Sequence, residues 1–125
     1  MKKIIRTNNA PAPIGPYNQA VMAGNFLFVS GQIAIDPATG NLVTGDIQVE
    51  TRLVMDNISA ILTEAGLSFS NIVKTTIFLM DMGQFAQVNE IYGTYFTTDA
   101  PARETVQVSG LPKGVNVEIS VIAVV

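Results

Sequence analysis

Two rows of polar residues near the end of the 125-residue sequence have the types and spacing to support chemistry. One row takes every second position from Arg103 to Gln107, and the other takes every second position from Asn116 to Ser120. Side chains of a β-strand alternate between its faces, so each row lies on one face of a predicted strand. A guanidinium binds a carboxylate through two parallel hydrogen bonds, and a glutamate accepts a proton from water. Arg103 and Glu118 therefore indicate a site for a small carboxylate with a general base beside it.

The segment between the two rows decides how they meet. Two glycines and a proline within residues 110–114 predict a loop that joins the two strands as a pair. The register that brings the polar faces together places Thr105 opposite Glu118. Arg103 and Glu118 then become diagonal neighbours on one face, in reach through their long side chains. The same pattern fits a cross-strand salt bridge on a solvated face, which contributes little to stability.

The composition narrows the chemistry that the chain supports. The sequence has neither Cys nor His, which excludes disulfides, Ser–His and Cys–His catalysis, and disfavours an ordinary zinc site. The formal net charge is −3, and the few Lys and Arg residues are scattered, so no basic patch for nucleic acid is visible. No apolar run has transmembrane length and no signal-peptide pattern follows Met1, so we expect a cytoplasmic protein that does not contact membranes.

Periodicity predicts an α+β fold in a single domain over residues 1–125. Strands are predicted over residues 3–6, 20–23, 26–32 and 72–80, and helices over 46–65 and 84–96. The strand over 72–80 is apolar on both faces, so we expect it to be covered on both sides. Two helices cover one face of such a sheet. The other face carries Ile122 and Val124 and needs subunits to cover it, which predicts a closed homo-oligomer with a site in a cleft between subunits.

Three residues before the first helix also attract attention. Tyr17 follows the stiff dipeptide Gly15–Pro16, which suits either a packing anchor or a hydroxyl aimed at a site. Ser30 ends a predicted strand, where a hydroxyl bonded to nearby backbone is the simplest interpretation. Gly31 in the same strand indicates that another group approaches the backbone closely.

Three separated motifs resemble one known family. IGPYNQA at residues 14–20, SGQIAIDPATG at 30–40 and APARETVQVSGLP followed by VEISVIA at 100–123 are similar to the YjgF/RidA family of imine deaminases. The resemblance spans essentially the whole chain, with the motifs in order at matching spacing. It implies a chorismate-mutase-like α+β fold and a homotrimer with three sites between subunits. It also implies hydrolysis of 2-imino acids, such as 2-iminobutanoate and 2-iminopropanoate, to 2-oxo acids and ammonia, with no cofactor.

The resemblance also assigns roles to individual residues. Arg103 matches the carboxylate-binding arginine of the family, and Glu118 matches its water-activating acid. Gly31 matches a glycine whose backbone N–H faces the ligand. The other positions that match the family pocket are Tyr17, Ser30, Asn89 and Thr105. Many members have Cys where this chain has Thr105, and many have an acidic residue where it has Ser120, so neither a thiol nor that second acid belongs to the expected mechanism.

Two other functions compete with imine hydrolysis. A binding module would hold 2-oxo acids or other small carboxylates in the same cleft and signal through the trimer, with Arg103 serving equally well. RNA cleavage, an activity sometimes attached to this family, fits poorly with a pI of about 4.7 and no basic groove.

Overall fold

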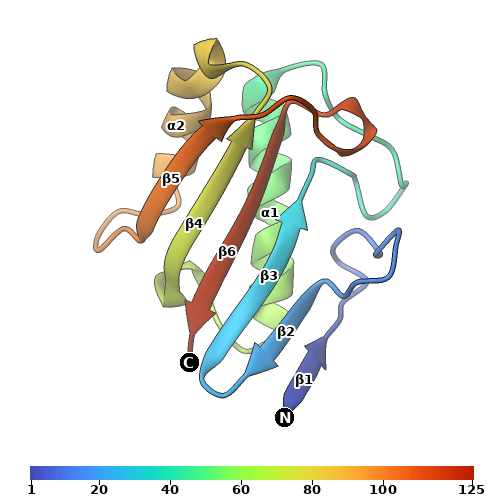
Figure 1. The fold of residues 1–125 in the computed structure, drawn as a ribbon, viewed down its shortest axis with the longest axis vertical. Coiled ribbons are helices and arrows are strands. Elements are labelled where there is room, and N and C mark those ends of the chain that lie inside the picture. Colours follow the sequence, from blue (N-terminus) through green and yellow to red (C-terminus); the bar gives the residue numbers. More distant parts are fainter.

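The computed structural model describes all 125 residues. The fold is a six-stranded sheet with two helices on one face (Figure 1). This is the predicted α+β architecture. The sheet has the order β1-β2-β3-β6-β4-β5, and every neighbouring pair is antiparallel except β4 and β5. The elements in chain order are β1 (Lys2–Ile5), β2 (Ala20–Ala23), β3 (Phe26–Gln32), α1 (Ile47–Glu64), β4 (Ile72–Leu79), α2 (Phe85–Gly93), β5 (Ala102–Gln107) and β6 (Val117–Val124).

Helix α1 follows the signals in its sequence. Asp46 precedes it, and its carboxylate accepts hydrogen bonds from the backbone N–H groups of Gln48 and Val49 at 2.8 and 3.1 Å. The apolar stripe of α1, which includes Val54 and Ile58, is fully buried against the sheet. Helix α2 is shorter than predicted, because regular helix ends at Gly93. None of the helices is long and apolar enough to cross a membrane.

The predicted pairing between the last two strands is wrong. β5 and β6 are not neighbours, because β4 lies between them and pairs with both. Thr105 therefore does not lie opposite Glu118. The physical reason is the connection from β4 through α2 to β5, which forms a parallel crossover unit and leaves β5 at the edge of the sheet. The chain then crosses back over β4 to reach β6 (Figure 1).

This strand order places Arg103 and Glu118 on opposite faces of the sheet. Directly paired residues share a face, and Arg103 pairs with Thr75, which is fully buried and accepts a hydrogen bond from Tyr92 of α2 at 3.0 Å. Glu118 pairs with Phe78 instead, on the face that the helices leave open. The expectation that the two residues are diagonal neighbours is therefore also wrong.

The open face carries exposed apolar side chains, as predicted. Phe26 and Phe28 are 48% and 47% exposed, and they pair with Val124 and Ile122 of β6. β4 was expected to be covered on both sides, but within this chain only its helix-facing residues are fully buried, whereas Phe78 on the open face is partly exposed.

Candidate functional site

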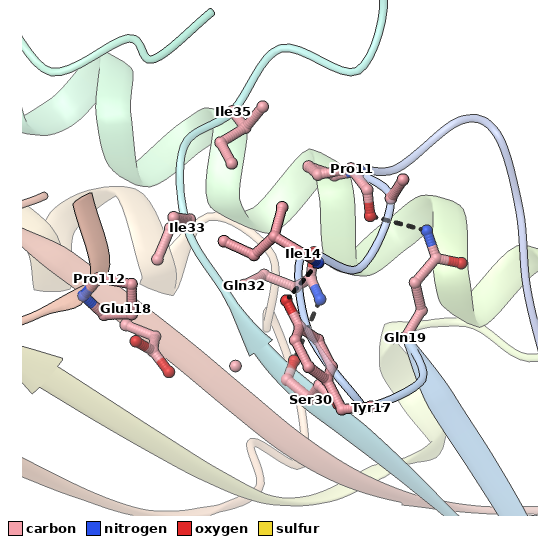
Figure 2. Close-up of a pocket in the computed structure, with 12 residues that line it drawn as sticks. Pro11, Ile14, Tyr17, Gln19, Ser30, Gln32, Ile33, Ile35, Pro112 and Glu118 are labelled. Atoms are coloured by element: carbon pink, nitrogen blue, oxygen red, sulfur yellow. Dashed lines mark hydrogen bonds between the residues drawn. The ribbon is translucent and has the colours of Figure 1, made fainter. Parts of the chain in front are cut away.

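A cavity of about 400 Å³ opens at one end of the sheet (Figure 2). Three segments meet there: the proline-rich loop before β2, the end of β3 with the residues after it, and the start of β6 with the turn before it. Apolar side chains from the loop and from the residues after β3 line the cavity together with polar side chains from β3 and β6. The lining residues are Pro11, Ala12, Ile14, Tyr17, Gln19, Ser30, Gly31, Gln32, Ile33, Ile35, Pro112 and Glu118.

The carboxylate of Glu118 packs directly against the backbone of Gly31. A Cβ atom built on Gly31 would overlap the Glu118 side chain, so only glycine leaves room for the carboxylate in this place. The register between β3 and β6 is interrupted between Val29 and Gln32, which is where Gly31 lies. The close approach predicted at Gly31 is confirmed, and the approaching group is Glu118.

Glu118 is the titratable group of this cavity with a shifted pKa. Its side chain forms no ion pair within the chain, where the one salt bridge joins Lys74 and Glu104. Removal of water from the half-buried carboxyl raises the pKa of Glu118 above its usual range. A carboxylate with a raised pKa is a stronger proton acceptor, which suits a general base near neutral pH.

Tyr17 and Ser30 differ in how their hydroxyls are used. The ring of Tyr17 is 47% exposed, and its hydroxyl accepts one long hydrogen bond of 3.4 Å from the backbone N–H of Ile14. Tyr17 is therefore a residue of the cavity wall rather than a core anchor (Figure 2). The hydroxyl of Ser30 donates to the carbonyl of Asn18 at 2.6 Å, as the simplest interpretation predicted. Its oxygen retains lone pairs that can accept a hydrogen bond.

The proline-rich loop is held in place by a residue that the sequence analysis missed. Gln19 is buried; its side-chain oxygen accepts from the backbone N–H of Thr7 at 2.8 Å, and its amide donates to the carbonyls of Thr7 and Pro11 at 3.0 and 2.9 Å. These bonds satisfy backbone groups that no secondary structure satisfies. The signal in the sequence was a glutamine next to the apolar start of β2.

Arg103 lies in a second depression, on the helix-covered side of the sheet near α2. One terminal nitrogen of its guanidinium donates to the side-chain oxygen of Asn89 at 2.7 Å. The guanidinium carbon lies 5.0 Å from the ring centre of Tyr92 and 5.5 Å from that of Phe85. These contacts hold the planar group at the surface and leave its other N–H donors available for a carboxylate. Gly93, Ala100 and Pro101 complete the depression.

Sequence reasoning predicted the helix that carries Phe85 and Tyr92 but gave no sign of their contact with Arg103. That contact exists because β5 is the strand beside α2. Burial raises the pKa of Tyr92, although its hydrogen bond to Thr75 and the charge of Arg103 act in the opposite direction.

The structure divides the predicted site residues into two groups. One cavity contains Tyr17, Ser30, Gly31 and Glu118, and the second depression contains Asn89 and Arg103. Thr105 lines neither; its hydroxyl oxygen is buried without a hydrogen-bond partner. Within one chain, Glu118 and Arg103 are therefore separated by the sheet.

Comparisons with known proteins agree over nearly the whole chain. The family model described as endoribonuclease L-PSP matches residues 7–125. A RutC family protein of Pyrococcus horikoshii is 56% identical, over 98% of each chain. The 2-iminobutanoate/2-iminopropanoate deaminase of Mus musculus is 48% identical, over 99% of this chain and 92% of the mouse protein. The crystal structure of Escherichia coli TdcF with bound serine superposes with a TM-score of 0.94 at 45% identity, over 98% of each chain.

Proposed function

The chain belongs to the endoribonuclease L-PSP family, also called the YjgF/RidA family, and from this premise we propose that it hydrolyses 2-imino acids to 2-oxo acids and ammonia. One observation carries the proposal: a half-buried carboxylate without an ion-pair partner, Glu118, faces a cavity of about 400 Å³. A carboxylate in such surroundings is a general-base candidate. The deaminase activity named for the mouse relative supports the same reaction.

We further propose that each site forms between two subunits of a homotrimer. Arg103 and Glu118 lie on opposite faces of one sheet, so a substrate that contacts both needs Glu118 from one subunit and Arg103 from its neighbour. The exposed apolar residues Phe26 and Phe28 offer a surface that a neighbour would cover. A contact between two different surfaces closes into a ring when repeated by rotation, and a ring of three gives three equivalent sites.

The reaction needs positioning and proton transfer. A 2-imino acid is already electrophilic at its C=N carbon. Arg103 binds the substrate carboxylate through two N–H donors and fixes that carbon beside Glu118. Glu118 accepts a proton as water adds to the C=N carbon, which gives a tetrahedral carbinolamine. Glu118 returns this proton to the former imine nitrogen, which completes the carbinolamine, and then moves the hydroxyl proton of the carbinolamine to the amino group, so that the C–N bond breaks and ammonia leaves as the carbonyl of the 2-oxo acid forms.

A carboxylate-binding trimer without catalysis is the second candidate. The free donors of Arg103 favour it as much as they favour the enzyme, and TdcF was solved with serine bound. We place either protein in the cytoplasm. We do not extend the proposal to RNA cleavage, because a net charge of −3 opposes a nucleic-acid surface.

One assay separates the enzyme from the binder. Purified protein is added to a threonine dehydratase reaction, and the decay of 2-iminobutanoate is followed in real time against its spontaneous decay. We expect Glu118→Gln to lower imine hydrolysis by roughly 10²–10⁴-fold while 2-oxobutanoate still binds. Arg103→Ala should lose both hydrolysis and binding, because the clamp serves both. Hydrolysis by Glu118→Gln at the wild-type rate would leave only the binding function.

A further inference from the structure

A buried acidic residue outside the cavity holds the start of β6. Glu50 lies on α1 and is fully buried. One of its oxygens accepts from the backbone N–H groups of Asn116 and Val117 at 2.8 and 3.2 Å, and the other accepts from the side-chain amide of Asn116 at 2.8 Å. Three N–H donors from two consecutive residues thus converge on one carboxyl group.

Burial of a carboxyl group destabilises a fold unless hydrogen bonds replace those that it loses to water, and the three donors of Asn116 and Val117 provide that replacement. The segment before β6 contains the single turn Pro112–Gly114. The start of β6 is held by its pairing with β3 and β4, by the hydrogen bond from the Met80 N–H to the Asn116 carbonyl at 3.1 Å and by the clamp of Glu50.

Glu118 is the residue that follows the clamped pair. Its carboxylate fits against Gly31 with no space for even one additional carbon atom on that side. A small rotation of the backbone at Val117 would therefore move the carboxylate out of this position. Glu50 is not among the residues that line the cavity, so any influence it has on the reaction passes through β6.

We propose that Glu50 is a positioning residue that sets the Glu118 carboxylate in the cavity by fixing the backbone of Asn116 and Val117. The expected loss of rate in Glu50 variants rests on the proposed imine hydrolysis, whereas the expected displacement of the Glu118 carboxylate does not. Arg103 lies on β5 and is not part of the clamp. The binding of the substrate carboxylate by Arg103 is therefore independent of Glu50.

The variant Glu50→Gln tests this with a minimal change of shape. Its amide keeps one oxygen for the two backbone N–H groups but turns an N–H group towards the side-chain amide of Asn116, which must turn over to accept it, so the clamp is rearranged. We expect kcat per folded subunit to fall about 10–100-fold, as for a small misplacement of a reacting group, with KM within about twofold. The matched control is Thr51→Val, since Thr51 is the buried neighbour whose hydroxyl bonds only within α1, to Ile47 at 2.7 Å. It should keep the wild-type kcat.

A double-mutant cycle separates positioning from plain stabilisation. If Glu50 acts through Glu118, Glu50→Gln lowers the residual rate of Glu118→Gln no further. If Glu50 only stabilises the fold, Glu50→Gln would lower the melting temperature but leave kcat per folded subunit at the wild-type value. That result would overturn the proposal. Asn116→Ala removes a single hydrogen bond of the clamp and should lower kcat in the same direction by less, which keeps the test decisive if Glu50→Gln folds poorly.

Crystal structures of the wild type and Glu50→Gln provide a readout that needs no activity. We expect the Glu118 carboxylate to leave its place against Gly31 in the variant. A carboxylate that keeps that place would refute the positioning role. Absence of imine hydrolysis in the wild type would instead refute the proposed function, and the crystal comparison would still decide the role of Glu50.

Discussion

Glu118 and Arg103 are prepared for their proposed roles in different ways. Glu118 is set in surroundings that disfavour its charge, so its pKa is raised by desolvation. Arg103 remains at the surface and is oriented by the Asn89 side chain and two aromatic rings. The first residue is tuned to accept a proton, and the second is pre-oriented to bind an anion.

The raised pKa of Glu118 predicts a stability cost that depends on pH. A carboxyl whose pKa is higher in the folded state favours folding while it is protonated, and that contribution is lost as pH rises through the folded-state pKa. Glu118→Gln removes the titration. Its melting temperature should therefore exceed that of the wild type at pH 8, and the difference should shrink towards pH 4. A series of thermal melts checks this prediction.

Glu104→Gln is the control for that series. Glu104 is exposed, and its pKa is lowered by a hydrogen bond from Thr76 and by Lys74. The contribution of Glu104 to stability therefore depends on pH in the opposite direction, and the replacement of Glu104 should bring no gain in stability at pH 8. A stability gain of Glu118→Gln that is the same at every pH would show that desolvation of the charge is not its cause.

Gly31→Ala should impair catalysis through Glu118. The added methyl group takes the place of the carboxylate, which must turn away from the cavity. We expect imine hydrolysis to fall about 10²-fold, as for a reacting group displaced by roughly 1 Å. The control is Gly45→Ala, where an added Cβ meets nothing within 4 Å and which lines neither the cavity nor the depression at Arg103. Wild-type hydrolysis by Gly31→Ala would mean that the observed carboxylate position is not the working one.

At the scale of elements, the sequence predicted most of the secondary structure and little of the site geometry. The cap at Asp46 and the turn at Gly24–Asn25 are local signals, so α1 and the β2–β3 hairpin could be predicted. Alternation within a strand shows which residues share a face, but it does not show which strand lies next to it. The interposition of β4 was therefore not predictable from Arg103 and Glu118 alone.

The buried polar residues of α1 were visible in the sequence but were not interpreted. Glu50 lies four positions before Val54, on the stripe that faces the core, and a charged residue on such a stripe signals a buried partner. Which backbone groups it binds depends on contacts 66 and 67 residues away along the chain. Those contacts follow only from the tertiary structure.

A second polar residue of α1 predicts how that helix supports the cavity wall. The buried amide of Asn57 donates to the carbonyls of Ile33 and Ile35 at 3.3 and 3.0 Å, and both of these residues line the cavity. Asn57→Leu leaves the carbonyl of Ile35 without a partner, whereas the carbonyl of Ile33 keeps its bond from the Ile35 N–H at 2.9 Å, so we expect it to cost about 1–3 kcal/mol of unfolding free energy. Denaturant unfolding measures this loss.

Asn57→Leu should also change the affinity of the cavity for its ligand. With the segment after β3 loosened, affinity for 2-oxobutanoate should weaken, because the apolar wall of the cavity is no longer fixed. Thr51→Val is again the matched control on the same helix. Unchanged stability in Asn57→Leu would show that water or backbone rearrangement replaces its hydrogen bonds.

For the whole molecule, the chain presents most of its predicted site residues at two separate places, which we propose are the two halves of a shared site. Its open face carries Phe26, Phe28, Ile122 and the Glu118 cavity, whereas the edge formed by α2 and β5 carries Arg103. The open apolar face of the sheet already predicted that other subunits cover it. Sedimentation should therefore give a trimer, and a monodisperse monomer at micromolar concentration would contradict the shared site.

Mixed trimers test the central claim most directly. Arg103→Ala and Glu118→Gln subunits, each nearly inactive alone, are co-expressed with different tags, and trimers that contain both are purified. If each site takes Glu118 from one subunit and Arg103 from its neighbour, every trimer that contains both variants has one intact site of three. Such trimers then recover about a third of the wild-type rate of imine hydrolysis per trimer. Mixed trimers no more active than their parents would contradict a site shared between subunits.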